Sequence, residues 1–473
     1  MKRSIDEAYV MDTIEREAET YYKKYRPYMQ LLESVAHWKK FRKPNEWDYR
    51  ALGKMLESVD EMVKMCENMG TVADLGILPK IARDVVTIVY GTSPLPIIAS
   101  IQPLDEEVGL VYYKRVKAVS GGGNISAGDV IVSVYGDFVT PQGFSNAEVT
   151  ETIGTGDGST TTFTATLTYK PVRPGTVSVV AGNITAQDYN YDGKLLGEGV
   201  KGTIDYGTGE IEVTFDEAPA NGVNVVATYW GNVEDLQLGV REINYELDTK
   251  QVRAKIYALK GMTGLFKSWQ FQKRFGRAAE EELATDLINA INSEIMGDLI
   301  RKMKAMLPGS VTWSASVPSG VSYFEHKQSF KDAVAGAERY IIENSKRGKV
   351  SFIIAGTKVC SVIRTLFGWN QLYDGRGMFG AYLFGELDGI PVINVPDTSL
   401  LEANRAIVGY KGMSDFEAPA VFCPYMPITV TTVLPTIHPL VTQRAVACWA
   451  AVEVLINRFL YGLTVTGSLP YES

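Results

Sequence analysis

The stretch Ala278–Met306, AAEEELATDLINAINSEIMGDLIRKMKAM, decides the fold of this chain. Apolar residues recur every three to four positions along it, and Pro308 and Gly309 follow its last turn. This spacing predicts a single amphipathic helix. The apolar positions are Leu283, Leu287, Ile288, Ile291, Ile295, Leu299, Ile300 and Met303. At about 1.5 Å per residue the helix would be about 43 Å long, which suits a structural spine.

The segments on either side of this helix show strand and helix patterns. Residues 242–259 before it are strand-like, and residues 328–410 after it contain apolar strands such as Val350–Ala355 between helical stretches. Residues 426–464 return to β-rich patterns, and residues 108–117 form an earlier strand. Helices that flank a central sheet predict an α/β or α+β subdomain after the spine, within a chain that is α+β as a whole.

The first 70 residues are helical in pattern and highly charged, with 13 basic and 13 acidic residues. Leu52, Met55, Leu56 and Val59 follow a spacing of three to four residues, as in one face of a helix. Two arrangements are compatible with this pattern, a helical domain that folds on itself or an extended arm that packs on neighbours. Nearly equal charges of both signs favour salt-bridged faces over binding of nucleic acid.

Residues 148–232 differ in composition from both flanks. They contain 11 acidic and 4 basic residues, so this stretch has a net charge of −7 out of −8 for the whole chain. Short alternating segments such as Thr161–Tyr169 and Val223–Tyr229 are separated by turn sequences such as Asp192-Gly193 and Asn221-Gly222. Several short strands at this spacing predict an inserted all-β sandwich module.

The bulk composition excludes several classes of protein. Hydrophobic residues make up 45% and charged residues 22% of 473 residues, which is ordinary for a globular chain. A net charge of −8 argues against a protein that wraps DNA. The uncharged runs Val85–Leu104 and Ala418–Gln443 are interrupted by prolines, so they predict buried strands and turns rather than membrane helices. Residues 1–19 lack the apolar core of a secretory signal.

Neither the cysteines nor the histidines show a pattern typical of chemistry. The cysteines are far apart and form no CxxC pair, so a zinc site is not expected. We expect the cysteines to be small buried residues of the core instead. The histidines are isolated from one another and from any nucleophile motif. The residues concerned are Cys66, Cys360, Cys423 and Cys448, and His37, His326 and His438.

The glycine-rich and acidic clusters are likewise predicted to form turns and helix ends rather than binding sites. Gly197–Gly202 matches GxGxxG but lies among turn sequences of a β-rich stretch, and Gly154–Ser159 lacks the lysine of a phosphate loop. Glu280–Glu282 suits the first turn of the spine helix, where carboxylates complement the helix dipole. The turns Asp188–Asp192 and Asp205–Glu217 offer oxygen ligands for Ca²⁺ but follow no known loop pattern. We therefore predict no enzyme activity and no catalytic, cofactor or metal residues.

The order of these parts resembles the major capsid proteins of tailed bacteriophages, which have the Hong Kong 97 fold, and more narrowly the T-even type. The resemblance covers roughly residues 81–147 and 233–445. Three stretches show it: Ile101-Gln-Pro-Leu104 followed by Gly109-Leu-Val111; Leu247–Leu259 leading into the spine helix; and Val408-Gly-Tyr-Lys-Gly412 followed by Cys423-Pro-Tyr425.

The resemblance implies a role for each part of the chain. The expected parts are an N-terminal helical arm (1–80), a first part of the peripheral domain (81–117), an extended loop (118–240) with the inserted β module (148–232), the peripheral domain with its spine helix (241–330, helix 278–306), an axial domain (331–425), and closing strands with the C-terminus (426–473). The function implied is structural, as hexamers and pentamers of an icosahedral shell around double-stranded DNA.

The resemblance also implies where the protein acts and with what. Its partners would be copies of itself, with scaffold, portal and decoration proteins as further partners, DNA as non-specific content and no membrane. It would fold in the host cytoplasm and reside in the virion. Two alternatives stay open at this stage: a cellular encapsulin-like shell, and a secreted glycan-binding or glycan-hydrolysing protein, suggested by the β module and its aromatic residues Tyr189, Tyr191 and Trp230.

Overall fold

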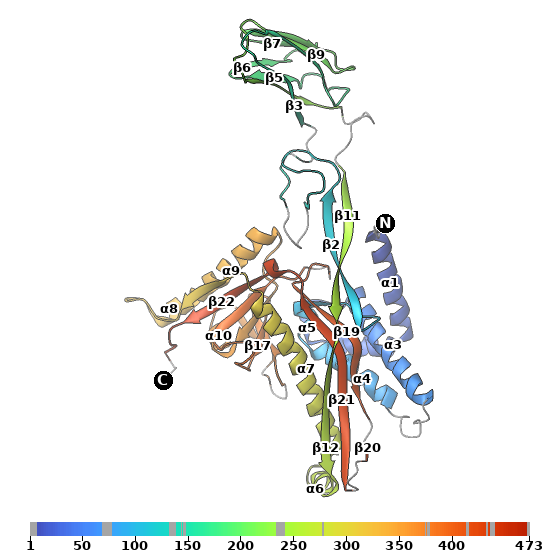
Figure 1. Ribbon diagram of the computed structural model, residues 1–473. Coiled ribbons are helices and arrows are strands. Elements are labelled where there is room, and N and C mark those ends of the chain that lie inside the picture. The colour runs from blue at the N-terminus through green and yellow to red at the C-terminus, as the bar shows by residue number, and fades with distance from the viewer. Residues whose placement is uncertain are drawn as a thin grey trace. The chain divides into compact units, whose positions relative to one another are not determined.

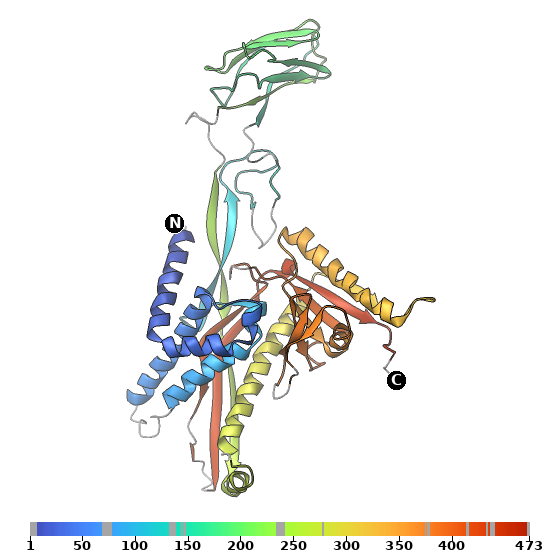
Figure 2. The same cartoon turned by 180° about the vertical axis from the view of Figure 1, so that it is seen from behind.

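The computed structural model describes residues 7–68, 78–131, 139–142, 144, 148–232, 242–276, 279–373, 375, 379–412, 416–431, 434–435 and 440–470. The chain divides into two compact units (Figures 1 and 2). One comprises the chain up to Lys114 and from Leu247 onward, and the other comprises most of Arg115–Glu246.

The spine helix α7 (Ala279–Ala305) lies against a five-stranded sheet of the first unit. The path of this sheet is β1 (Ala99–Ile101), β19 (Ala420–Val430), β21 (Val441–Val454) and β12 (Lys255–Gly264), and β20 (Leu434–Pro435) also pairs with β21. One face of α7 is buried, including Ile291, Leu299 and Met303, which are 0% exposed. The predicted helix 278–306 is thus confirmed, and its acidic first turn and basic last turn complement the helix dipole.

The N-terminal helices pack into the same core as α7. They are α1 (Glu7–Lys24), α2 (Arg26–Val35), the 3-10 turn η1 (His37–Lys40), α3 (Glu46–Asn68), α4 (Leu78–Thr92) and the short α5 (Leu95–Ile98). Met29, Leu52 and Leu56 are fully buried and join α7 and the sheet in one apolar cluster. The helical domain therefore folds on the body of its own chain.

The interpretation of Val85–Leu104 as strands and turns is wrong for most of its length. Residues up to Thr92 belong to helix α4, and residues 95–98 form α5, so only Ala99–Ile101 is a strand. The prolines lie where a helix tolerates them: Pro94 follows the end of α4, and Pro96 lies in the first turn of α5. The prolines misled the prediction, because they separate two helices here, and one side of α4, including Val86, is buried in the core.

A second sheet of seven strands follows the spine. Its order is β13 (Ser310–Ser314), β22 (Leu460–Thr466), β18 (Arg405–Gly409), β14 (Phe352–Gly356), β17 (Ile390–Val395), β16 (Tyr382–Leu387) and β15 (Trp369–Gln371). The helices α9 (Phe330–Ser345) and α10 (Thr357–Ile363) pack on it, and α8 (Tyr323–Gln328) precedes α9.

The central strand β14 explains why its sequence is a continuous apolar run. Ile353 and Ala355 belong to the cluster that contains α9 and α10, whereas Phe352 and Ile354 belong to the cluster that contains α7. All five residues of β14 are buried, as in strands covered on both faces. The predicted alternation of helix and strand over 328–410 is confirmed.

Two long strands, β2 (Val108–Ala118) and β11 (Ile243–Arg253), pair with each other and run from the first unit into the second. The second unit contains one eight-stranded sheet in the order β3, β10, β5, β6, β7, β8, β9 and β4. Their bounds are β3 (Glu148–Thr155), β4 (Thr162–Thr166), β5 (Ser178–Ala181), β6 (Ile184–Gln187), β7 (Lys194–Gly197), β8 (Val200–Ile204), β9 (Glu210–Phe215) and β10 (Asn224–Trp230).

This module is all-β, as predicted for residues 148–232, and its strands belong to one continuous hydrogen-bonded path. The end strands β3 and β4 also contact each other, because Gly154 lies against the ring of Phe163 with no room for a Cβ. The sheet therefore curls around a single core, in which Val213, Val225 and Tyr229 are fully buried. The α+β fold class is confirmed for the chain as a whole, with helices and sheets in the first unit and the all-β module in the second.

Candidate functional site

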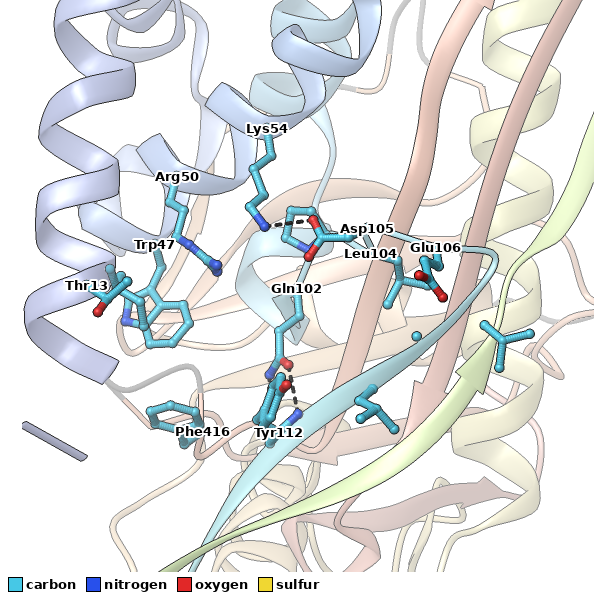
Figure 3. A pocket seen from close by; sticks show the side chains of 15 residues that line it. Thr13, Trp47, Arg50, Lys54, Gln102, Leu104, Asp105, Glu106, Tyr112 and Phe416 are labelled. Atoms are coloured by element: carbon cyan, nitrogen blue, oxygen red, sulfur yellow. Dashed lines mark hydrogen bonds and ion pairs between the residues drawn. The ribbon is translucent and has the colours of Figure 1, made fainter. Parts of the chain in front are cut away.

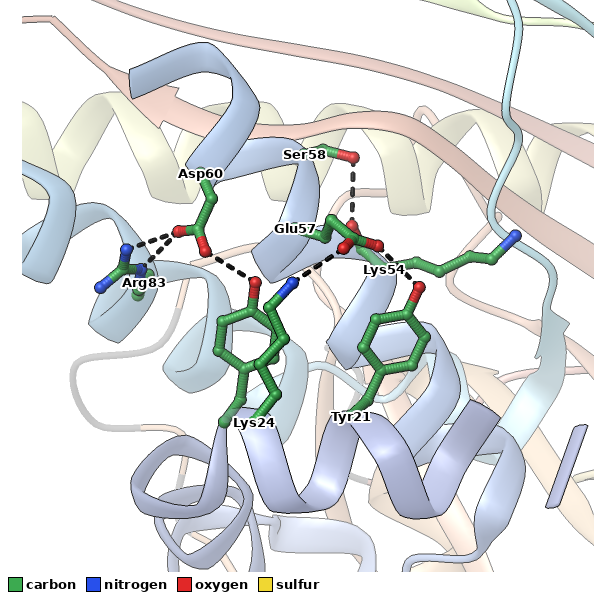
Figure 4. A network of polar contacts seen from close by, with 8 residues as sticks. Tyr21, Lys24, Lys54, Glu57, Ser58, Asp60 and Arg83 are labelled. Atoms are coloured by element: carbon green, nitrogen blue, oxygen red, sulfur yellow. Dashed lines mark hydrogen bonds and ion pairs between the residues drawn. The ribbon is translucent and has the colours of Figure 1, made fainter. Parts of the chain in front are cut away.

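A network of polar contacts joins the N-terminal helices (Figure 4). On one side, the Tyr21 hydroxyl donates to Glu57 at 2.7 Å and the Lys24 ammonium donates to the same carboxylate at 2.8 Å. On the other, Asp60 accepts from the Tyr25 hydroxyl at 2.7 Å and from Arg83 Nε at 2.8 Å. Helices α1, α3 and α4 are thus cross-linked by charge-assisted hydrogen bonds, which are stronger than neutral ones.

The electrostatics of this network follow from burial and pairing. The hydrogen bond from Lys24, and next the one from Tyr21, hold the pKa of Glu57 below its usual value. Desolvation raises the pKa of Tyr21 and of Tyr25, and their carboxylate partners raise it further. Both phenols therefore stay protonated and donate at any ordinary pH.

Further contacts tie these helices to distant parts of the first unit. Lys40 forms an ion pair with Glu386 on β16 at 2.5 Å. The Lys411 ammonium donates to the carbonyl oxygens of Pro96 and Ala99 at 2.8 and 2.6 Å. Lys411 lies in the stretch 408–412 that shows the family resemblance, so that stretch positions the junction between α5 and β1.

A groove of about 510 Å³ lies where α1, α3 and β2 meet (Figure 3). The rings of Trp47 and Phe416 form one wall and pack edge to face, with centroids 5.1 Å apart. Gln102, which is only 8% exposed, accepts from the backbone N–H of Tyr112 at 3.2 Å and donates to its carbonyl at 3.4 Å. The Gln102 amide therefore takes the place of a neighbouring strand at this edge of β2.

Three charged groups of the groove, Arg50, Lys54 and Asp105, are paired. Lys54 donates to Asp105 at 2.9 Å, and Arg50 forms an ion pair with Glu17 at 2.5 Å. Among the described residues that line the groove there is no histidine, cysteine or serine. The groove combines the Trp47 and Phe416 rings with paired charged groups, an arrangement that suits packing rather than nucleophilic attack.

The structure places the histidines apart from one another. His326 Nε2 lies 2.8 Å from the carbonyl oxygen of Ser314, and its ring stacks on Trp313 at 5.2 Å. His37 stacks on Tyr373 at 4.5 Å, and burial, with a smaller contribution from Lys39, lowers its pKa. Each described histidine is thus part of a packed contact. His438 lies outside the described residues.

Three cysteines are buried, and their thiols are free. Burial raises the pKa of Cys360 and Cys448 to about 12, and it raises the pKa of Cys423 further. A thiol that stays protonated is a poor nucleophile. The side chain of Cys66 lies outside the described residues.

The glycine motifs in the β module are turns. Gly197–Gly202 forms the hairpin of β7 and β8, in which Gly197 pairs with Val200 and Gly199 has a φ of +74°. In the stretch Gly154–Ser159, Asp157 accepts from the backbone N–H groups of Ser159 and Thr160 at 2.8 and 2.6 Å. These hydrogen bonds hold the pKa of Asp157 well below its usual value.

The acidic turns of the module are also used by the protein itself. Asp188 is 4% exposed and accepts from Tyr206 and from the backbone N–H of Gly175. Asp205 accepts from the N–H groups of Gly207 and Thr208. Within the described part of the chain no group of three or more His, Cys, Asp or Glu is arranged to hold a metal ion. No helix there is long and apolar enough to cross a bilayer.

The sequence analysis missed helix α6 (Leu265–Phe275), which begins where β12 ends. None of its residues is buried, and Phe266, Trp269 and Phe275 are 69%, 58% and 64% exposed. Such a dense group of exposed rings marks an interaction surface. The sequence holds a clue, because residues 255–278 contain six basic and no acidic residues. In the module, Tyr189, Tyr191 and Trp230 are also exposed.

Residues 95–464 match the family described as major capsid protein Gp23. This match includes the three stretches that show the resemblance, α7, the five-stranded sheet and all but the last two residues of the seven-stranded sheet. No curated protein matches the chain.

Several solved structures are similar at low identity. The capsid of Myoviridae phage XM1 is 8% identical, with a TM-score of 0.32, over 71% of this chain and 96% of that one. The head of Helicobacter pylori bacteriophage KHP40 is 11% identical, with a TM-score of 0.33, over 50% and 80%. A virus-like particle from Pyrococcus furiosus is 11% identical, with a TM-score of 0.31, over 46% and 80%.

Proposed function

The chain belongs to the Gp23 family of major capsid proteins, and from this premise we propose that it forms hexamers and pentamers of an icosahedral shell that encloses double-stranded DNA. It is a structural protein of a tailed-phage virion, has the Hong Kong 97 fold and associates with copies of itself. The single observation that supports the proposal is the family match over most of the chain, residues 95–464.

The physical properties of the chain suit repeated self-association. Outside residues 148–232 the charges sum to −1, so copies of the body repel one another little. A closed shell multiplies weak contacts, since each subunit meets several neighbours at once. The internal polar network of the N-terminal helices and the core around α7 make each subunit rigid, so its contact surfaces keep fixed positions.

We propose the following roles for the parts of the chain. Residues 81–117 and 241–330 act with residues 426–473 as the peripheral domain, residues 331–425 as the axial domain and residues 118–240 as the extended loop. The strand pair β2 and β11, which runs from one unit into the other, supports the placement of the loop. Residues 1–80 act as an N-terminal arm whose helices pack on their own subunit.

The β module would lie on the outer face of the shell. Its net charge of −7 over residues 148–232 disfavours contact with packaged DNA and favours solubility of the particle. Electron microscopy of particles with and without the module tests this placement, because loss of density from the inner surface would contradict it. A glycan array probed with whole particles tests whether Tyr189, Tyr191 and Trp230 bind host-surface glycans.

We further propose that the protein has no enzyme activity and needs no cofactor, which the structural role of the family and the buried, protonated thiols support. Its expected partners beyond itself are scaffold, portal and decoration proteins, with DNA as non-specific content and assembly in the host cytoplasm.

Negative-stain microscopy of the purified full-length chain tests the assignment. Hollow shells or hexamers are expected, and a strictly monomeric protein at high concentration would contradict it. An encapsulin-like compartment is the weaker alternative, which co-purification of a cargo enzyme without DNA would favour. The family match leaves a secreted glycan-acting enzyme without support.

A further inference from the structure

One histidine joins the N-terminal helices to the edge of the seven-stranded sheet. His37 lies in the turn η1, and its ring stacks on the ring of Tyr373, with centroids 4.5 Å apart and planes inclined by 28°. The backbone N–H of Tyr373 donates to the carbonyl oxygen of Phe384 on β16 at 3.2 Å. Trp38, the next residue of η1, is 1% exposed and packs in the core cluster around α7. The stack therefore connects two parts of the first unit that are each held in place by other contacts.

The surroundings of this imidazole suit its neutral form. Nδ1 of His37 is buried and has no hydrogen-bond partner among the described residues. A neutral imidazole can leave Nδ1 without a hydrogen, whereas an imidazolium has a hydrogen on both nitrogens. Protonation would bury a donor without an acceptor, which costs more than the attraction between a cation and the Tyr373 ring returns. Burial, and next the positive charge of Lys39, accordingly lower the pKa of His37.

On the sheet side of this contact, the other titratable groups keep one protonation state in mild acid. Glu386 on β16 pairs with Lys40 and accepts from Asn370, and these two contacts hold its pKa below the usual value. Burial raises the pKa of Tyr373, so its phenol stays protonated. Between about pH 4.5 and 6.5, the imidazole is therefore the group that titrates among the described groups of this contact.

The acidic groups of the helices around η1 have other partners. The hydroxyl of Tyr90, near the end of α4, donates to Asp48 at 2.9 Å, and Arg42 donates to the same carboxylate at 2.6 Å. Glu33 of α2 accepts from two tyrosine hydroxyls. Both carboxylates are thus engaged, so neither offers an unpaired negative charge to a protonated His37.

We propose that His37 makes the contact between the N-terminal helices and the seven-stranded sheet sensitive to mild acid. At neutral pH the imidazole is uncharged and stacks on Tyr373. Its pKa is lower in the folded state than in the unfolded chain, so the open contact binds more protons as the pH falls below about 6.5. The stabilisation by this contact is therefore complete above that pH and declines as the pH falls toward the lowered pKa. The device acts within one subunit and does not depend on the proposed function.

Hydrogen exchange of the unassembled full-length chain at about pH 7.5 and about pH 5.5 tests the proposal, after correction for the intrinsic pH dependence of amide exchange. In the native chain, amides of residues 37–42 and 372–373 should exchange about threefold or more faster at the lower pH. His37→Phe keeps a ring on Tyr373 and cannot titrate, so exchange there should differ by less than about 1.5-fold between the two pH values. His37→Gln removes the titration without an added ring and gives the same comparison if the first variant does not fold.

His326→Phe is the matched control, because His326 also stacks on a ring, that of Trp313, and the acid response at η1 should persist in this variant. Asp374 follows Tyr373 in the sequence and lies outside the described residues, and Asp374→Asn should likewise retain the response. A native chain without the response overturns the inference, as does an equal response in the folded His37 variants. Loss of the response in Asp374→Asn also overturns it and assigns the acid sensitivity to that carboxylate.

Discussion

A glycine in the middle of helix α3 should be intolerant of alanine, although helices usually gain from this change. Gly53 is buried where α3 crosses α1, and an added Cβ would overlap Cβ and Cγ of Tyr21 and approach Cδ1 to 2.8 Å. Because the Cβ of Tyr21 is fixed to the backbone of α1, rotation of the ring cannot remove the overlap. The two helices must move apart for Gly53→Ala to fit.

The magnitude follows from two opposing effects. Alanine in place of glycine in a helix interior stabilises by about 1 kcal/mol, whereas overpacking of a well-packed contact costs about 1–3 kcal/mol. Separation of the helices also strains the hydrogen bond between Tyr21 and Glu57 (Figure 4). Glu57 follows Gly53 by four residues, which is about one helical turn. A charge-assisted hydrogen bond is worth about 1.5–3 kcal/mol. We therefore expect a net loss of about 1–3 kcal/mol.

Hydrogen exchange followed by mass spectrometry on unassembled protein measures this effect locally. Amides of α1 and α3 should exchange faster in Gly53→Ala, and those of α9 should not change. Gly336→Ala in α9 is the matched control, because its added Cβ would lie 3.5 Å from Val311, an ordinary contact. That variant should gain about 0.5–1 kcal/mol. Slower exchange in α1 and α3 of Gly53→Ala would refute the packing argument.

Three further variants probe the core, the polar network and the β module. Leu299→Ala, at a fully buried position of α7, should cost about 3–5 kcal/mol in denaturant unfolding of the first unit, and a cost below about 1 kcal/mol would contradict a tightly packed spine. Because Lys24 lowers the pKa of Glu57, that carboxylate stabilises the fold above about pH 4.3, and the stabilisation is lost as the pH falls through the lowered pKa. Glu57→Gln should thus lower the melting temperature at pH 7, and the difference from native should shrink below pH 4; a constant difference would exclude the ion pair. Asp157→Ala should speed exchange at the β3–β4 turn, where Asp157 accepts from Ser159 and Thr160, and unchanged exchange would show that the turn does not depend on this carboxylate.

Periodic apolar patterns allowed most of the fold to be predicted. The spine was predicted within one residue at each end, and the alternation of β9 and β10 identified the module. These elements have one buried face or stripe, so the period of their apolar residues indicates whether each is a helix or a strand. Val85–Leu104 was misassigned because prolines were taken to exclude helices over the whole run, whereas they lie at the ends of α4 and α5, and burial against the α7 core favours a helix in α4.

The candidate surfaces were harder to predict, because they depend on exposure. The rings of Phe266 and Trp269 look in sequence like core residues of an amphipathic helix, and only the fold shows that α6 has no buried residue. Likewise, Gln102 is an ordinary polar residue in the sequence, and its role in holding the edge of β2 depends on a contact ten residues away along the chain. Charge composition was the one signal for α6 that did not require the structure.

The net charge of −8 conceals a segregation that matters for assembly. The β module has a net charge of −7, and residues 255–278 have a net charge of +6. The first 70 residues contain 13 basic and 13 acidic residues, so their net charge is zero. A subunit with uniformly spread negative charge would repel its copies in every orientation. Charge gathered in separate segments instead allows two copies to attract in the orientations that bring segments of unlike charge together. Segregated charge therefore affects which orientations of two copies are allowed more than how tightly they bind.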